Sequence, residues 1–151
     1  MSFTADLSAW VSRQRWFAGK SHDPRLRILD AQPTREAVRY LVMDDAGSRP
    51  TLYHVPLARP AAGTDAETVA SDASGPLIDA AQHPPFTIGL LADMGVDVER
   101  VRGSRVLTGE QSNTSIVFEE DDRPTIILKL FRTLHHGENP DVTVQRVLSD
   151  A

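Results

Sequence analysis

The sequence has 151 residues and contains no cysteine, which excludes both a disulfide framework and a thiolate metal site. No apolar run approaches the roughly 20 residues that a membrane-spanning helix needs. The first residues also lack the basic flank and apolar core of a signal peptide. We therefore expect a cytoplasmic protein with no membrane partner.

Dense positive charge is also absent, although the net charge of −5 is unevenly distributed. Residues 1–60 carry nine basic and six acidic side chains, whereas residues 61–100 carry one basic and seven acidic side chains. The basic residues are scattered and nearly all are arginine, which is typical of solvation and local ion pairs. No segment has the basic density of a nucleic-acid-binding face, so we expect no nucleic-acid partner.

Lysine is scarce, because the sequence has only two lysines and fourteen arginines. One of the two lysines lies within an apolar strand-like run. Lys129 lies in the middle of the run Thr125-Ile126-Ile127-Leu128-Lys129-Leu130-Phe131. Side chains alternate between the two faces of a strand, so Lys129 shares a face with Ile127 and Phe131. A buried ammonium group is costly unless an anion meets it, and the pattern therefore predicts an anionic partner for Lys129.

A small-residue loop, Gly109-Glu110-Gln111-Ser112-Asn113-Thr114-Ser115, precedes this strand. Its short side chains would let backbone N–H groups approach a phosphate, and its hydroxyls would add donors. It is not a Walker A loop, because Gly-Lys-Ser/Thr is missing. Taken alone, the loop also fits a polar hairpin turn, and Lys129 also fits an edge-strand lysine that reaches solvent. Their order, loop, strand, turn and lysine strand, predicts the nucleotide-binding half of a kinase-like fold.

The first half of the chain predicts one helix and several strands. Thr4 is the expected cap of a helix through Gln14, with Leu7, Trp10 and Val11 on one apolar stripe and Gly19 as the helix stop. Strands are expected over residues 26–29, 37–43 and 51–57, and a turn at 44–47 joins the last two into a hairpin. Pro56 and Pro60 predict that the third strand lies at a sheet edge or ends there.

The middle of the chain is less regular. Residues 58–75 fit either a loop or a loop interrupted by a short strand near 67–70, and residues 76–83 suggest a short helix. Pro84-Pro85 breaks that helix, and a second apolar stripe at helical spacing, Phe86, Leu90, Leu91 and Met94, ends at Gly95. We place a subdomain boundary near residues 95–100.

The last third predicts strands over residues 101–107, 114–118 and 125–132, and the fold class is therefore α+β. Asn139-Pro140-Asp141 is a strong helix start, and its apolar stripe is Val144, Val147 and Leu148. The sequence ends about three turns into that helix, which we interpret as a chain cut within an element.

The sequence resembles the N-terminal region of bacterial maltokinases and the related glucosamine kinases, which are similar in fold to aminoglycoside phosphotransferases. The matching segments occur in family order: Arg15-Trp16-Phe17-Ala18-Gly19-Lys20-Ser21, Tyr53-His54-Val55-Pro56-Leu57-Ala58, residues 109–115, Ile127-Leu128-Lys129-Leu130-Phe131-Arg132 and Gly137-Glu138-Asn139-Pro140-Asp141-Val142. The third and fourth segments together are the most specific.

The resemblance implies a layout and a nucleotide site. Residues 1–95 would be an N-terminal cap subdomain of antiparallel strands and helices, and residues 96–151 would be a small kinase-like N-lobe. In the family, the Ser-rich loop covers the ATP phosphates and the strand lysine contacts them. The residues that match are Gln111, Ser112, Asn113, Thr114, Ser115 and Lys129. The implied reaction, with ATP and Mg²⁺, passes the γ-phosphate of ATP to a sugar hydroxyl. In maltokinases the product is maltose 1-phosphate, which feeds α-glucan synthesis.

The catalytic half of the family is missing from this sequence, so no catalytic residue is expected in the chain. Phosphoryl transfer needs a carboxylate that accepts the sugar proton and Asp or Asn ligands for Mg²⁺. The resemblance places these groups, and most of the sugar site, in a helical C-lobe beyond residue 151. His135-His136 lies between the lysine strand and the helix, and we interpret it as a solvent-facing connection rather than a metal site.

A second departure concerns the partner of Lys129. Family members often carry an acid where Thr143 stands. Glu138, Asp141 and Gln145 are not obvious replacements, and Glu110 is another local candidate.

Three interpretations follow from these observations. The first is the ATP-phosphate-binding portion of a sugar kinase that is not catalytically competent alone and works with its C-lobe. The second is a natural non-catalytic adaptor or regulator that binds a partner protein, or a second copy of itself through Val144, Val147 and Leu148. The third is an unrelated α+β domain in which the loop and Lys129 are structural.

Overall fold

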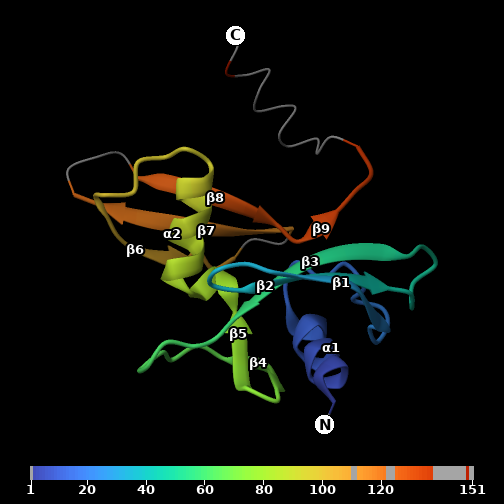
Figure 1. Cartoon of the computed structure of the whole chain (residues 1–151). Helices are drawn as coiled ribbons and strands as arrows, with labels where there is room; N and C mark the ends of the chain where they lie inside the picture. The colour runs from blue at the N-terminus through green and yellow to red at the C-terminus, as the bar shows by residue number, and fades with distance from the viewer. Residues whose placement is uncertain (1, 110–111, 122–124, 138–148, 150–151) are drawn as a thin grey trace.

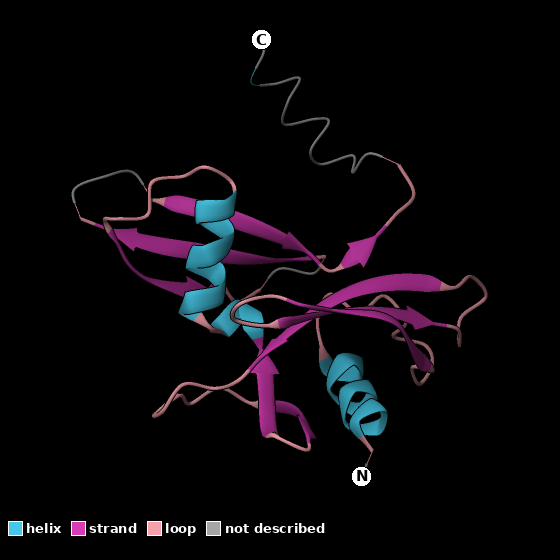
Figure 2. Cartoon of the chain, in the orientation of Figure 1, coloured by secondary structure: helices cyan, strands magenta, loops and turns pink. Residues whose placement is uncertain are grey.

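The computed structural model describes residues 2–109, 112–121, 125–137 and 149, and it consists of two antiparallel sheets with two α-helices (Figures 1 and 2). The helices are α1 (Phe3–Arg13) and α2 (Pro84–Asp93), with a short 3₁₀ helix η1 (Ala80–Gln82). The strands are β1 (Leu26–Pro33), β2 (Val38–Asp44), β3 (Thr51–Ala58), β4 (Thr68–Asp72), β5 (Gly75–Asp79), β6 (Val101–Val106), β7 (Asn113–Glu120), β8 (Ile126–Phe131) and β9 (Thr133–Leu134). The predicted α+β class is confirmed.

The larger sheet has the order β1-β2-β3-β5-β4, and β9 also pairs with β3. Helix α1 packs on one face of this sheet. Its residues Leu7, Trp10 and Val11, the apolar stripe that the sequence predicts, are buried in the core between them. Trp16 and Phe17 complete this core beyond the end of the helix. The predicted hairpin of residues 37–43 and 51–57 is confirmed as β2 and β3, which pair in register from Val38↔Leu57 to Asp44↔Thr51.

The ends of α1 differ from the prediction. Ser2, not Thr4, caps the helix, because its Oγ accepts a hydrogen bond from Ala5 N at 3.3 Å. The helix ends at Arg13, with Gln14 as the C-cap, so Gly19 is not its stop. Gly19 is instead a packing position, since a Cβ added there would lie 2.5 Å from Phe17 Cζ and 2.7 Å from His22 Nε2.

The edge position predicted from Pro56 is wrong, because β3 lies in the interior of the sheet, whereas the alternative that the strand ends here is confirmed, since β3 ends at Ala58, before Pro60. One side of β3 pairs with β2 throughout, while its other side changes partners along the strand. It pairs with β9 at Leu52 and Tyr53 and with β5 at Leu57 and Ala58. Pro56 lies between these two pairings, where the missing N–H costs no ladder hydrogen bond.

The segment between β3 and α2 forms a hairpin rather than a helix. β4 and β5 pair from Thr68↔Ile78 to Asp72↔Gly75, which corrects the helix expected over residues 76–83 and confirms the strand alternative near 67–70. Asp79 ends β5 and caps η1 by accepting from Ala81 N at 3.2 Å. Pro84 and Pro85 are the first two residues of α2. The first four N–H groups of a helix have no intrahelical acceptor, so the missing N–H of proline costs no hydrogen bond there.

The smaller sheet, β6-β7-β8, confirms the three strands predicted in the last third. Helix α2 covers one face of it, and Leu91 packs there with Ile116, Phe118 and Leu130. Met94 is exposed, in contrast to the predicted stripe. The helix predicted from Asn139, with Val144, Val147 and Leu148, lies outside the described residues, and the boundary near 95–100 stays a prediction.

Candidate functional site

Lys129 lies on the exposed face of β8, opposite the face that α2 covers. The side chains of Ile127 and Lys129 are exposed, whereas those of Leu128 and Leu130 turn toward the core. The predicted alternation is therefore confirmed. The expectation of a costly buried ammonium group is wrong, because this face of the strand is open and Ile127 is 54% exposed.

The start of β7 lies beside this lysine. Ser115 pairs directly with Lys129, and Asn113 pairs with Phe131, so these four residues share one face of the two strands. Thr114 pairs with Leu130 and turns to the opposite face. Strand periodicity therefore divides the predicted phosphate-binding residues between two faces of β7.

The described loop residues differ in exposure. Ser112 is exposed, whereas Asn113, Thr114 and Ser115 belong to β7 and are buried. Gln111 and the candidate partner Glu110 lie outside the described residues. The roles of Gln111, Ser112, Asn113, Thr114, Ser115 and Lys129 toward a nucleotide stay predictions.

Thr114 has a protein partner that the sequence analysis did not identify. Arg132, which is 0% exposed, donates from Nε to Thr114 Oγ1 at 2.9 Å and from Nη2 to Asp79 Oδ2 at 2.6 Å. Its guanidinium carbon lies 5.3 Å from the centroid of the Trp16 ring. One buried arginine therefore joins β5, the start of β7 and the segment after α1.

A sequence signal for this junction does exist. Arg132 is two residues beyond Leu130 and four beyond Leu128, so strand periodicity places it on the inward face with them. An arginine on that face requires a buried carboxylate, and Asp79 at the end of β5 supplies it. Because the sequence wrongly predicts a helix over residues 76–83, it does not predict that Asp79 ends a strand.

His54 lies near the same junction, and the charges there affect the pKa of its imidazole. Its backbone N–H donates to Arg132 O at 2.7 Å, which extends the pairing of β3 with the chain after β8. Burial, together with the positive charges of Arg132 and Arg39, lowers the pKa of its imidazole to about 4. His54 is therefore a neutral imidazole in the folded protein near pH 7.

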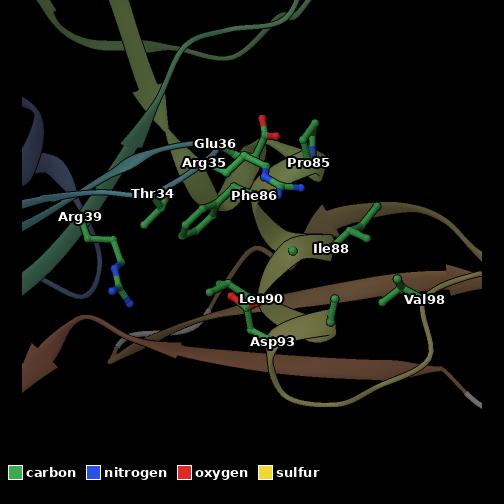
Figure 3. Close-up of a pocket in the computed structure, with 12 residues that line it drawn as sticks. Thr34, Arg35, Glu36, Arg39, Pro85, Phe86, Ile88, Leu90, Asp93 and Val98 are labelled. Atoms are coloured by element: carbon green, nitrogen blue, oxygen red, sulfur yellow. The ribbon is translucent and has the colours of Figure 1, made fainter.

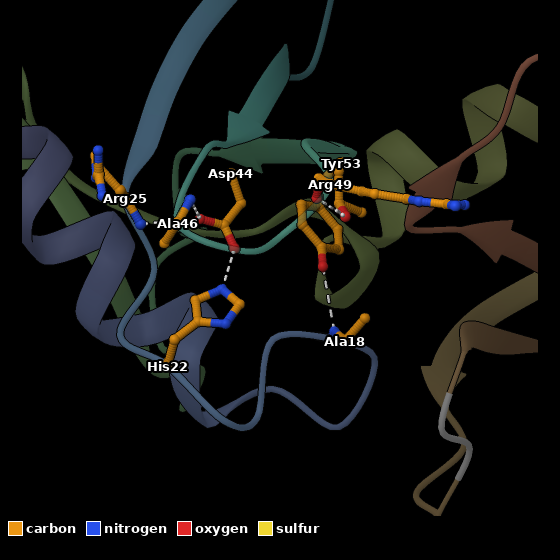
Figure 4. A network of polar contacts seen from close by, with 8 residues as sticks. Ala18, His22, Arg25, Asp44, Ala46, Arg49 and Tyr53 are labelled. Carbon is orange, nitrogen blue, oxygen red and sulfur yellow. Dashed lines mark hydrogen bonds and ion pairs between the residues drawn. The ribbon is translucent and has the colours of Figure 1, made fainter.

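The polar network around Asp44 anchors the turn between β2 and β3 (Figure 4). Its carboxylate contacts His22 Nε2 at 2.9 Å and accepts from Arg25 N at 2.9 Å and Ala46 N at 3.1 Å. Burial raises the pKa of Asp44, but the hydrogen bonds from His22 and the two backbone N–H groups outweigh it and hold the pKa below its ordinary value. Close by, Tyr53 Oη accepts from Ala18 N at 3.2 Å, which ties the segment after α1 to β3.

Several cavities lie where the larger sheet meets other described parts of the chain, and two of them exceed 500 Å³. One of about 540 Å³ lies between the β1–β2 turn and α2, where Arg35 and Arg39 face Phe86 and Leu90 (Figure 3). The other, of about 520 Å³, lies between the segment after α1 and the chain from Val106 to Thr114. The second cavity adjoins the predicted phosphate loop.

Metal ligation finds no support within the described ranges. His135 and His136 are exposed, as predicted for a connection facing solvent. In this part of the chain, no three His, Asp or Glu side chains lie close enough to hold an ion. The Mg²⁺ ligands, expected in a C-lobe beyond residue 151, stay a prediction. Among the residues that the structure describes, no helix is long and apolar enough to cross a membrane.

Fold and site together define an α+β protein in which a six-stranded sheet with its helix is joined to a three-stranded sheet carrying a loop and a lysine. Comparison with protein families identifies the first of these parts. The model of the maltokinase N-terminal cap domain matches residues 10–82, from within α1 to the end of η1. The predicted resemblance to the N-terminal region of maltokinases is therefore confirmed over this stretch.

Proposed function

We propose that this chain is the nucleotide-phosphate-binding portion of an ATP-dependent sugar kinase related to maltokinase. The cap-domain match supports a maltokinase-related N-terminal portion. In the smaller sheet, residues 111–115 would meet the ATP phosphates together with Lys129. These residues lie outside the matched stretch 10–82, so the nucleotide contact is proposed from their own chemistry.

The observation that carries the proposal is the pairing of Ser115 with Lys129 on neighbouring strands. Lys129, whose side chain is exposed, and Ser115, at the buried end of the small-residue loop, thus lie side by side on neighbouring strands. A phosphate there could accept from the Lys129 ammonium and from backbone N–H groups of the loop. Ile127 and Phe131 flank the lysine on this face.

The chain is expected to bind nucleotide without turning over substrate. No His-Gly-Asp motif occurs in the sequence, and the carboxylate that would accept a sugar proton has no candidate among the described residues of this site. ATP with Mg²⁺ and a C-lobe, in the same protein or a partner, would complete the reaction. The cap, in this proposal, is a scaffold for the loop.

The experiment is a titration of the chain with ATP, followed by NMR of backbone amides, in the unaltered protein, Lys129→Met and Lys20→Met. Lys20 is the only other lysine and lies in the cap segment, so it is the matched control. Loss of one charged hydrogen bond corresponds to about 1.5–3 kcal/mol, and we expect Lys129→Met to weaken binding by roughly 10- to 100-fold. Lys20→Met should bind like the unaltered chain.

Equal ATP affinity in Lys129→Met and the unaltered chain would contradict the proposed site. Turnover by the chain alone at about 1–100 per second, a rate typical of kinases, would contradict the non-catalytic assignment. No ATP binding by a folded chain would favour the adaptor interpretation instead.

A further inference from the structure

The cavity between the cap and the loop carries a second cationic group that lies away from Lys129. Arg15 lines this cavity of about 520 Å³ together with Gln82, Thr108, Gly109, Asn113 and Thr114. Its Nη1 lies beside Gly109, since a Cβ added to that glycine would be 3.8 Å away. Gly109 has φ +112°, a backbone conformation that favours glycine, and the absence of a side chain keeps this approach open.

The guanidinium of Arg15 has no hydrogen bond or ion pair with any described residue, and its side chain is exposed. Its neighbour Arg13 differs, because it is bound to Glu67 and to Ala9 O. Of the two arginines that line the cavity, Arg13 is therefore bound to other residues, whereas Arg15 has no partner in the part of the chain that the structure describes. An exposed Arg fork of this kind matches the oxygens of a phosphate group.

The wall of the cavity is in contact with the buried Arg132. Asp79, Trp16 and Thr114 all line it, and all three contact Arg132 behind them. The ion pair at 2.6 Å neutralises Asp79, so this carboxylate does not repel an anion as a free one would. Arg132 Nη1 is buried and has no hydrogen-bond partner within the described ranges. Behind the wall there is therefore a buried cation with one unpartnered nitrogen, and the described residues that line the cavity carry no uncompensated negative charge.

We propose that this cavity binds the phosphate group of a small molecule, with Arg15 as its principal ligand. Gln82, which lines the cavity, offers amide N–H donors, and Thr108 offers a hydroxyl. The site is distinct from Lys129, which lies on the outward face of β8, whereas Thr114 and Arg132 turn inward. The cap would thus contribute its own phosphate-binding residue at the loop.

The same chemistry is carried by a nucleotide diphosphate and by a sugar phosphate. The test titrates the chain separately with pyrophosphate, ADP and glucose 1-phosphate and follows the backbone amides of Arg15, Gln82 and Gly109 by NMR. Tighter binding of ADP would assign the cavity to the nucleotide, and tighter binding of glucose 1-phosphate would assign it to a sugar phosphate. Both results support a phosphate site.

Arg15→Ala should weaken pyrophosphate binding about tenfold or more, and Arg15→Lys, which keeps the charge but loses the fork, should retain part of the affinity. Arg49→Ala removes an exposed arginine on another cavity and should have no effect. Lys129→Met should leave the shifts of Gln82 and Gly109 intact, which separates this site from the ATP contact proposed for Lys129.

The proposal is overturned if pyrophosphate moves none of the three amides, or if Arg15→Ala binds as the unaltered chain does. An equal loss in Arg49→Ala would also overturn it, because that result indicates attraction by overall charge. Because Arg15 is exposed, unchanged thermal melting of Arg15→Ala and Arg15→Lys is expected, and it confirms that any loss of binding is local.

Discussion

Asp79 and Arg132 form a buried ion pair, Oδ2 to Nη2 at 2.6 Å, across 53 positions of the chain. Asp79 is the last residue of β5, and Arg132 directly follows β8, so the pair ties the larger sheet to the lysine strand. Its other contacts, Thr114 and Trp16, bring the start of β7 and the segment after α1 to the same point. This junction fixes where the predicted phosphate loop ends relative to the cap.

Replacing Asp79 by Asn should destabilise the protein by about 3–5 kcal/mol, because it leaves the Arg132 guanidinium buried without its counter-charge. Denaturant unfolding of the unaltered and variant chains measures the difference. Asp121→Asn is the matched control, since Asp121 pairs with Arg102 at 2.9 Å but both side chains are exposed. That change should cost no more than about 1 kcal/mol, and an equal loss in both variants would contradict the importance of burial.

Thr114→Val should cost about 1–3 kcal/mol of unfolding free energy, because the Nε of Arg132 would lose its acceptor inside the protein. Thr114→Ser retains the hydroxyl and should recover most of that loss. Ser112→Ala, at the exposed end of the same loop, should be nearly neutral. Thermal melting of the three variants distinguishes them, and equal melting of Thr114→Val and Ser112→Ala would show that the hydroxyl has no structural role.

Stability should fall as the pH is lowered from about 6.5 toward about 4, because of His54. Its pKa is about 4 in the fold and 6.5 in the unfolded chain, so the unfolded state binds the proton first. A shift of this size corresponds to about 3 kcal/mol between neutral and acidic pH. Unfolding free energies at several pH values should show this slope, and His54→Gln should flatten it.

His135→Gln is the control for that experiment, since His135 is exposed. It should retain the slope of the unaltered chain. A His54→Gln protein with an unchanged pH dependence would contradict the assignment of a buried neutral imidazole.

Gly19→Ala should be destabilising by roughly 1–3 kcal/mol, because its Cβ would overlap Phe17 and the His22 ring that holds Asp44. Gly89→Ala provides the contrasting case within α2, where an added Cβ meets nothing within 4 Å. There the better helix propensity of alanine should stabilise by up to about 1 kcal/mol. Melting temperatures that move in the same direction would contradict this packing account.

Strand and helix periodicity predicted much of this fold. The stripe of Leu7, Trp10 and Val11, the β2–β3 hairpin and the alternation around Lys129 all follow from local spacing, and the structure confirms them. Failures occurred where a distant partner decides the outcome. Pro56 predicts an edge strand because its local sequence does not show that β9 and β5 both pair with one side of β3. Their paired residues lie 20 to 82 positions away along the chain.

In the candidate site, too, a local feature was predictable from the sequence and a distant contact was not. The position of Lys129 opposite Ser115 is local, since a short turn joins β7 and β8. The Arg132 junction is not, because its carboxylate comes from β5 and its aromatic neighbour from the chain after α1. Local spacing indicated only that Arg132 faces inward, and no local rule selects Asp79 among the acidic residues of the sequence.

The pairing of β3 with β9 bears on how this protein is made. Leu52 and Tyr53 acquire their partners only when Thr133 and Leu134 have left the ribosome, about 80 residues later. Until then that side of β3 is an unpaired strand edge, which is a template for association between nascent chains. Shortened versions that stop after η1 would keep this edge open, so an expression design for the cap should carry the chain through Leu134.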